Sequence, residues 1–239
     1  MKIDEKRLRE EAEDIIRSAV PGGALSEHAS KKLLKLYGVE TVEERLFADP
    51  AEAGAWAEAA GRPMVVKLCS PDVAHKKERG FVKTGLTGGE AVETAAREML
   101  SRASDVRVEG ILVQETVVGE RELLAGLSRD PVFGPCVTLG LGGIFAEAFG
   151  DVSVRVAPVT EYDVRDMLSS LKSAAVFSNY RGLAAVDEAS LARTFIGLGA
   201  IGMNHPEAAE IDVNPLIIDG AGKPVAVDAL VIISKGGGK

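Results

Sequence analysis

The sequence has few of the residues that build disulfide frameworks, metal clusters or aromatic binding sites. Its 239 residues include two cysteines, three histidines and one tryptophan, and only 5% are aromatic. Two thiols alone make neither a disulfide framework nor a metal site, and both Cys69 and Cys136 stand in apolar segments. We therefore expect both cysteines to be small core residues.

Long hydrophobic runs and an excess of positive charge are also missing. No apolar run approaches the ~20 residues that a membrane-spanning helix requires. The opening segment, MKIDEKRLREEAEDII, is too charged for the apolar core of a secretory signal. The formal net charge of −8 disfavours a nucleic-acid binder, which normally has a basic face. These absences predict a cytoplasmic protein that binds neither nucleic acid nor membrane.

Two regions of different texture indicate an α+β fold with two lobes. The first is rich in helices: we expect them at 4–19, 26–38, 49–61 and 88–103. From Gly110 onward, six strand-like runs dominate, interrupted by helices near 160–172 and 187–204. Strands and helices do not alternate strictly, which favours α+β over a doubly wound parallel sheet. The expected division is an N-terminal helix (1–22), two lobes (23–112 and 113–235) and a disordered tail (236–239).

One lysine interrupts an otherwise apolar strand, PMVVKLCS (63–70). Lys67 must reach solvent or meet an anion, because an unpaired ammonium is costly to bury. It could be the solvent-facing lysine of an edge strand or a phosphate ligand at a strand end. A glycine-rich turn at Gly140, Gly142 and Gly143 leaves a similar choice between a phosphate-binding turn and ordinary hairpin glycines.

Polar side chains alternate with apolar ones in AAEIDVNPLII (208–218), which a turn, DGAGKP, joins to PVAVDALVII. Glu210, Asp212 and Asn214 therefore share one face of the first strand, and Asp228 lies in the second. The pattern is also that of a half-exposed sheet. Acids are poor strand formers, however, and oxygen-bearing side chains on one surface suit Mg²⁺ bound together with phosphates. We favour the metal site.

A basic loop, PDVAHKKERGFV (71–82), follows the lysine strand. It contains His75 directly before Lys76 and Lys77, with Arg79 close behind. The residues alone leave two interpretations open, a solvated surface loop or a local site for an anion.

Several segments together resemble a known family. GILVQETVVGERELLAGLSRDPVFGP, GLGG followed by a glutamate, and EIDVNPL are similar to the ATP-grasp (β) subunit of ADP-forming acyl-CoA synthetases, above all ADP-forming acetate–CoA ligase. This family is related to the β chain of succinyl-CoA synthetase. The resemblance covers about residues 23–235 and implies an ATP-grasp fold, in which two α+β lobes hold ATP in a cleft between them.

The resemblance also implies a reaction and partners. Acyl-CoA, ADP and phosphate would give acid, CoA and ATP, with Mg²⁺ as metal cofactor. The short chain is similar to a free-standing β subunit, which implies a separate CoA-binding α subunit in an α2β2 heterotetramer. That subunit would handle the acyl-CoA and the phosphate.

Site residues follow from the resemblance position by position. Lys67 corresponds to the strand lysine on the nucleotide phosphates, and His75 to a histidine that carries the phosphoryl group to ADP. The other implied nucleotide contacts are Gln114, Glu115 and Val117 at an interlobe hinge, Glu122, and the turn glycines Gly142 and Gly143. The implied Mg²⁺ ligands are Asn214 and Asp228, with Asp212 in support.

The loop after His75 departs from the family pattern. Lys77 and Glu78 replace a small hydroxyl residue and an aspartate, and Phe81 replaces a glycine, which predicts a stiffer turn. Two alternatives therefore remain: a nucleotide-sensing ATP-grasp module without catalysis, and a succinyl-CoA-synthetase-like β chain. The presence of His75 argues against the second.

Overall fold

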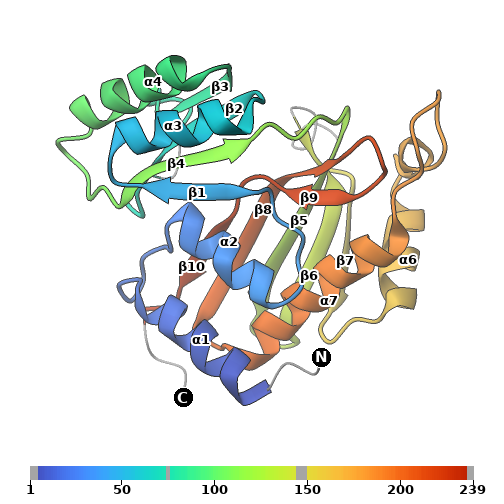
Figure 1. Cartoon of the computed structure of the whole chain (residues 1–239). Coiled ribbons are helices and arrows are strands. Elements are labelled where there is room, and N and C mark those ends of the chain that lie inside the picture. Colours follow the sequence, from blue (N-terminus) through green and yellow to red (C-terminus); the bar gives the residue numbers. More distant parts are fainter. Residues whose placement is uncertain (1–4, 74–75, 144–149, 236–239) are drawn as a thin grey trace. The chain divides into compact units, whose positions relative to one another are not determined.

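The computed structural model describes residues 5–73, 76–143 and 150–235 (Figure 1). The chain divides into two compact units. The smaller unit comprises Ser26–His28 and Val42–Thr116, and the larger one Met1–Leu25, Ala29–Thr41 and Val117–Lys239. The tail predicted at 236–239 lies outside the described residues.

The smaller unit is a four-stranded antiparallel sheet with two helices. The strand order is β1 (Glu44–Phe47), β4 (Gly110–Glu115), β2 (Met64–Cys69) and β3 (Val82–Leu86). Helices α3 (Pro50–Ala60) and α4 (Gly89–Ser101) lie side by side against this sheet (Figure 1). Apolar side chains of the two helices, β2 and β4 form its core.

Helix α3 begins and ends where its sequence predicts. The side chain of Asp49 accepts a hydrogen bond from the backbone N–H of Ala51 at 2.9 Å, and Pro50 occupies the first turn. Gly61 ends the helix with a φ of 62°, the left-handed conformation that glycine adopts without strain. These local signals confirm the predicted helix.

The larger unit is a six-stranded antiparallel sheet with helices on one face. The strand order is β10-β8-β5-β6-β7, and β9 pairs with β8 beside β10. The helices in its described residues are α1 (Glu5–Arg17), most of α2 (Glu27–Leu36), α6 (Glu161–Ser170), η2 (Ala174–Phe177) and α7 (Glu188–Asn204). Its strands are β5 (Arg121–Asp130), β6 (Gly134–Leu141), β7 (Val152–Val156), β8 (Ala208–Ile218), β9 (Pro224–Ala226) and β10 (Leu230–Ile233).

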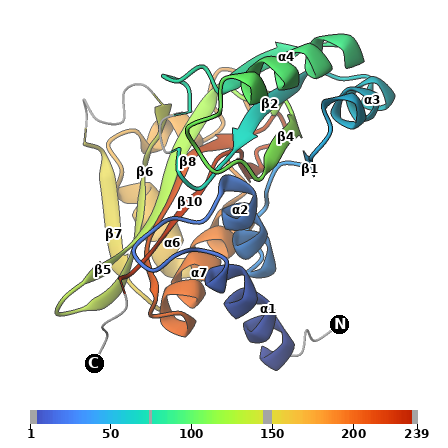
Figure 2. The same cartoon turned by 90° about the vertical axis from the view of Figure 1, so that its left-hand side faces the viewer.

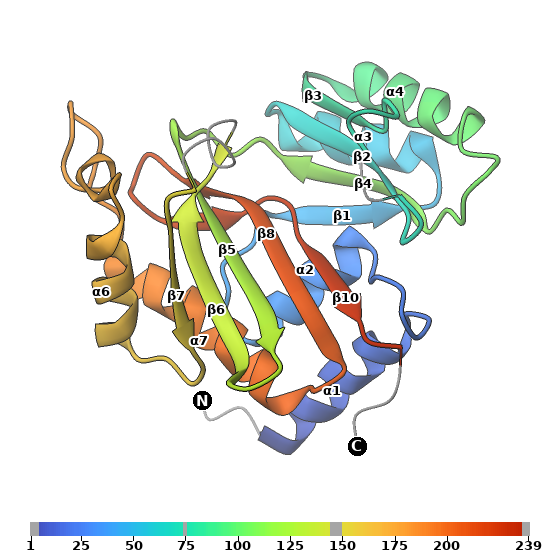
Figure 3. The same cartoon turned by 180° about the vertical axis from the view of Figure 1, so that it is seen from behind.

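The two faces of this larger sheet differ in chemistry. Leu123, Ala125 and Val137 point to the buried face, where α1, α2, α6 and α7 cover the strands (Figures 2 and 3). On the opposite face, the register aligns Asp212 with Gly126 and Thr138 in one row across the strands. Alternation of side chains along each strand thus places the polar residues of β8 on the face away from the helices.

Both predicted lobe boundaries differ from the units of the structure. The run ILVQETV was expected to open the second lobe, but β4 pairs with β1 and β2 in the smaller unit. Residues 29–41 group with the larger unit, since Leu33 and Leu34 pack in its core and Thr41 bridges Ala226. The mixed, antiparallel architecture itself agrees with the predicted α+β class.

Candidate functional site

Lys67 lies in the interior of the smaller unit. All six residues of β2 are buried, and only 6% of the Lys67 side chain is exposed. Its Nζ donates a hydrogen bond to Oε1 of Glu27 at 2.5 Å. The burial of Lys67 contradicts the interpretation as a solvent-facing lysine. The anion that it meets is a carboxylate of the chain itself, and its role as a phosphate ligand stays a prediction.

Glu27 is the centre of this buried charge cluster. It is the first residue of α2, and its side chain is fully buried. Its second oxygen, Oε2, accepts a hydrogen bond from Nζ of Lys76 at 2.7 Å. Nothing in the sequence marks Glu27 as functional, because an acid in the first turn of a helix is common and carries no functional signal by itself.

The end of the basic loop is anchored on the core. Phe81 is buried, and the guanidinium groups of Arg79 and Arg102 lie 4.9 and 6.0 Å from the centre of its ring. Arg102 also donates to the carbonyl of Gly80 at 2.8 Å. Phe81, which departs from the family pattern, thus fixes this end of the loop. His75, the predicted carrier of the phosphoryl group, lies outside the described residues.

Cys69, at the end of β2, is a structural residue rather than a nucleophile. It is buried, and its pKa is raised to about 11, chiefly by burial. A thiol in this state is protonated and unreactive at neutral pH. Cys136 is buried as well, so both cysteines are core residues as predicted.

The predicted hinge residues stand where the chain passes from one unit to the other. Gln114 is buried in β4, opposite Glu44 of β1 and Val65 of β2. Glu115 accepts a hydrogen bond from Arg62 at 2.7 Å. The smaller unit ends at Thr116, and Val117 is the next residue of the larger unit.

Glu122 and the turn glycines lie together in the larger unit. The N–H of Gly142 donates to the carbonyl of Glu122 at 2.9 Å. A Cβ atom on Gly142 would stand 2.8 Å from the backbone of Leu123, and one on Gly143 would stand 3.0 Å from Oε2 of Glu122. The backbone contact at Gly142 permits only glycine, and the Glu122 carboxylate lies beside Gly143 in the same turn.

The predicted metal residues lie in the middle of the hairpin that β8 forms with β9 and β10. Leu230 is paired with Asp212, and Ala226 with Leu216. The same register continues between these pairs, with a bond of 3.4 Å from the N–H of Val227 to the carbonyl of Pro215, and sets Asp228 opposite Asn214. Burial raises the pKa of Asp212, and the charges of Glu210 and Asp228 raise it further. The carboxylates are therefore close enough to repel one another.

The donor set of this hairpin suits a hard cation only in part. Across the described parts of the chain, no three acidic, histidine or cysteine side chains converge closely enough to hold a metal ion by themselves. Carboxylate and amide oxygens are the donors that Mg²⁺ prefers, and Mg²⁺ commonly completes its shell with phosphates and water. The residues fit an Mg²⁺ that arrives with a phosphate ligand.

Comparison with known proteins places the chain in a family. The ATP-grasp domain model matches residues 18–233. The chain is 34% identical over 233 residues to acetate–CoA ligase (ADP-forming) I subunit beta of Pyrococcus furiosus, covering 95% of the chain and 99% of the relative. The chain belongs to the ATP-grasp family. The predicted family and fold class are thereby confirmed, and the relatives are ADP-forming acetate–CoA ligases or their subunits.

One relative of this ATP-grasp chain is a longer protein. The chain is 35% identical over 235 residues to acetate–CoA ligase (ADP-forming) I of Archaeoglobus fulgidus, covering 96% of the chain but 34% of the relative. The chain thus spans about a third of that ligase and nearly all of the P. furiosus subunit.

A solved structure has the same fold. The dinucleotide-forming acetyl-coenzyme A synthetase 1 of Ca. Korarchaeum cryptofilum, in complex with coenzyme A, Ca-AMPCP and HgCl⁺, superposes with a TM-score of 0.83 at 39% identity. The match covers 88% of this chain and 93% of that one. The same synthetase has also been solved with Mg-AMPPCP, with a TM-score of 0.77 at 38% identity. No helix within 5–73, 76–143 or 150–235 is long and apolar enough to cross a membrane.

Proposed function

We propose that the chain is the nucleotide-binding β subunit of an ADP-forming acyl-CoA ligase. It acts with a CoA-binding α subunit in a cytoplasmic α2β2 heterotetramer, and converts acyl-CoA, ADP and phosphate into acid, CoA and ATP. The support is the near full-length match to a beta subunit of this class, together with a fold shared with a synthetase that binds coenzyme A and nucleotide analogues.

One observation carries the proposal furthest: a charged lysine buried in β2 and held by a buried carboxylate. Burying an ammonium group carries a desolvation penalty, and a buried ammonium suits the binding of a phosphate. Lys67 binds the phosphates of ADP, assisted by Glu122 and the backbone of Gly142 and Gly143. The adenine contacts are Gln114, Glu115 and Val117.

Mg²⁺ belongs to the proposed function as a partner of the nucleotide. Asn214 and Asp228 hold it, and Asp212 supports them. When bound, the ion neutralises phosphate charge and orients the transferring group. The side-chain oxygens of β8 supply only part of its shell, so metal and nucleotide bind together.

His75 is the proposed carrier of the phosphoryl group. A nitrogen of its neutral imidazole attacks phosphorus in the acyl phosphate or in a phosphohistidine of the α subunit; a new P–N bond forms as the carboxylate or the other imidazole leaves. A β-phosphate oxygen of ADP then attacks the phosphorus. The P–N bond breaks, ATP forms and His75 regains its neutral ring.

A reconstitution tests this function. The purified chain is combined with its α subunit, acetyl-CoA, phosphate, Mg²⁺ and ADP, and ATP formation is followed by a coupled assay. We expect ATP to form with the wild-type chain and to be lost in His75→Ala, while His205→Gln keeps the activity. Full activity of His75→Ala would overturn the relay, and no ATP from any simple acyl-CoA would overturn the ligase assignment.

A second candidate is a nucleotide sensor without phosphoryl transfer. It is favoured by the fixed end of the loop, where Phe81 is buried beneath Arg79 and Arg102. Binding of ADP by calorimetry, with no phosphorylated chain detected by mass spectrometry during turnover with the α subunit, would support the sensor instead.

A further inference from the structure

Glu27 differs from the predicted site residues because each of its two carboxylate oxygens accepts a hydrogen bond from a lysine. Oε1 accepts from Lys67 at 2.5 Å, and Oε2 from Lys76 at 2.7 Å. The three side chains come from three separate segments: the start of α2, strand β2 and the basic loop. One acid thus brings together two cations that the sequence separates by nine positions.

The structure distinguishes Lys76 from the other cations of the loop. The Arg79 guanidinium bonds both oxygens of Asp105, at 2.9 and 2.7 Å, on the exposed side of the unit. Lys77 is exposed. Only 11% of the Lys76 side chain is exposed, and it turns inward to the carboxylate that also holds Lys67.

Burial makes this carboxylate necessary for the geometry. The Glu27 side chain is fully buried, so water cannot replace it as a partner for the two ammonium groups. Without its charge, this carboxylate would no longer offset the repulsion between the two ammonium groups, which is strong at low dielectric. The two lysine side chains would then move apart.

We infer that Glu27 is a positioning residue that holds Lys67 and Lys76 together as a two-lysine clamp for a diphosphate group. The inference rests on the proposed function, since it assigns the phosphate end of the nucleotide to this cluster. Two adjacent ammonium groups match a diphosphate better than a monophosphate, because each can meet a different phosphate.

The test compares ligands that differ in phosphate number. Binding of Mg-ADP, AMP and inorganic pyrophosphate to the full chain is measured by calorimetry for wild type and Glu27→Gln. In Glu27→Gln, we expect the ratio of ADP affinity to AMP affinity to fall at least about tenfold. The affinity for pyrophosphate should fall by a similar factor. A merely structural role would weaken ADP and AMP equally.

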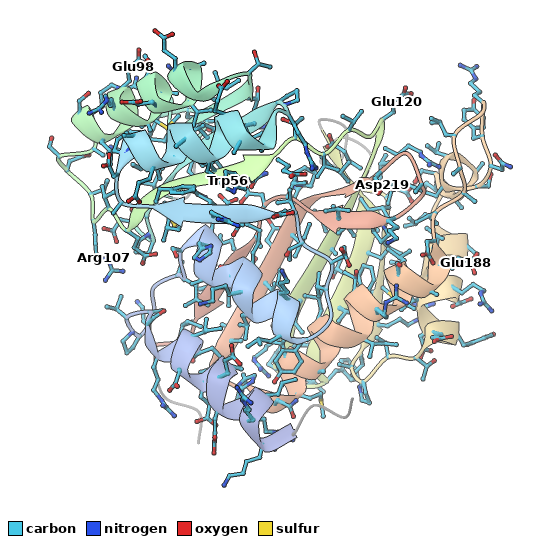
Figure 4. The ribbon with its side chains drawn as sticks, in the orientation of Figure 1. Trp56, Glu98, Arg107, Glu120, Glu188 and Asp219 are labelled. Atoms are coloured by element: carbon cyan, nitrogen blue, oxygen red, sulfur yellow. The ribbon has the colours of Figure 1, made fainter. Side chains whose placement is uncertain are left out.

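A matched control comes from the same unit. Glu98, on α4 (Figure 4), also forms an ion pair with a lysine, Lys83, but both side chains are exposed. Glu98→Gln removes the same charge, but from an exposed position instead of a buried one. We expect it to leave the ratio of ADP to AMP affinity unchanged.

Each outcome separates the inference from the proposed function. An unchanged ratio in Glu27→Gln, or tighter ADP binding, overturns the clamp while leaving the nucleotide function intact. Wild type that binds pyrophosphate but not ADP overturns the nucleotide function while the clamp stands. If Glu27→Gln does not fold, Lys76→Met preserves the pair of Glu27 and Lys67. It should lose about fivefold of the ADP preference, and an unchanged ratio there overturns the clamp.

Discussion

The two units of the chain hold charged side chains in opposite ways. In the smaller unit, Glu27 is fully buried between two lysines, so opposite charges of the chain itself meet there. In the larger unit, Asp212 is half-buried beside Glu210 and Asp228, whose charges raise its pKa in addition to burial. The first cluster is attractive within the chain, and the second is repulsive.

This difference indicates what each cluster gains from a ligand. A repulsive set of carboxylates is relieved by a cation, and half-exposed oxygens leave room for one. The lysine cluster is held in shape before any ligand arrives, so a phosphate meets cations that are already in position. Trp56, the single tryptophan, reports on the smaller unit alone, because it lies on α3 and contacts Phe47 (Figure 4).

The largest effect is expected from Lys67→Met. Lys67→Met removes one partner of the buried Glu27 carboxylate, which should lower the unfolding free energy by about 3 kcal/mol. Mg-ADP affinity should fall about 30-fold, as for a charge-assisted hydrogen bond worth about 2 kcal/mol. Urea unfolding followed by Trp56 fluorescence measures the first effect, and calorimetry the second.

Lys83→Met is the control for this variant, because Lys83 carries the same charge on β3 and 37% of its side chain is exposed. It should bind Mg-ADP like wild type. If Lys67→Met also binds Mg-ADP like wild type, Lys67 is a structural partner of Glu27 and not a phosphate ligand.

A smaller effect is expected at a buried histidine of the larger unit. His205 is 2% exposed, and its Nε2 lies 2.7 Å from the hydroxyl of Tyr37. Burial lowers the pKa of His205, and the charge of Arg9 lowers it further. The charges of Glu207 and Glu13 raise the pKa but do not outweigh burial. Tyr37→Phe should lower the unfolding free energy by about 1 kcal/mol, the net contribution of one hydrogen bond.

The pH dependence at this position has a defined sign. A histidine with a lowered pKa when folded binds its proton more readily when unfolded, so its contribution to stability is lost as pH falls below about 6.5. Unfolding followed by far-UV circular dichroism at pH 5 to 8 should show this loss in wild type and less of it in His205→Gln. Equal slopes in both proteins would contradict the assignment.

Local signals in the sequence predicted much of this structure. The caps of α3, the turn of the β8 hairpin and the alternation in β8 each depend on neighbouring residues. The hairpin also sets Asp228 opposite Asn214, because a short turn fixes the register of its two strands. Spacing therefore predicted that Asp212, Asn214 and Asp228 lie on neighbouring strands, and their role as metal ligands stays a prediction.

Structural features that depend on residues far apart in the sequence could not be predicted. Nothing in ILVQETV says that β4 joins the sheet of β1 and β2, since strand pairing is decided by packing across the whole unit. Glu27 was missed for the same reason: its two lysines lie 40 and 49 positions further along the chain. Lys67 itself was found because a charge in an apolar strand is a local anomaly.

Asp212→Asn is expected to increase stability modestly, whereas the variants above decrease it. The raised pKa of Asp212 means that its contribution to stability is present below the unfolded value of ~3.9 and is lost as pH rises through the folded pKa. Removing the charge should therefore stabilise the larger unit at pH 7 by about 0.5 kcal/mol, the size of a like-charge pair across a half-exposed sheet.

Circular dichroism checks this gain without Mg²⁺, and again with Mg-ADP present. The gain should shrink with Mg-ADP, which binds wild type more tightly than Asp212→Asn. Trp56 fluorescence should not change between the two proteins. A loss of stability at pH 7 in the variant would show that the carboxylates attract a group of the protein and do not repel one another.

The smallest effect is expected from Glu98→Gln in the smaller unit. Lys83 lowers the pKa of Glu98 by hydrogen bonding and charge, so any stability from this pair is present above the unfolded pKa and is lost in acid. Both side chains are exposed, and solvent screens the attraction. The unfolding midpoint at pH 7, read from Trp56 fluorescence, should match that of wild type within error. Lys67→Met and Glu98→Gln each remove one charge from a Lys–Glu pair in the same unit, so a shift in Glu98→Gln as large as that in Lys67→Met would show that burial does not set the strength of these pairs.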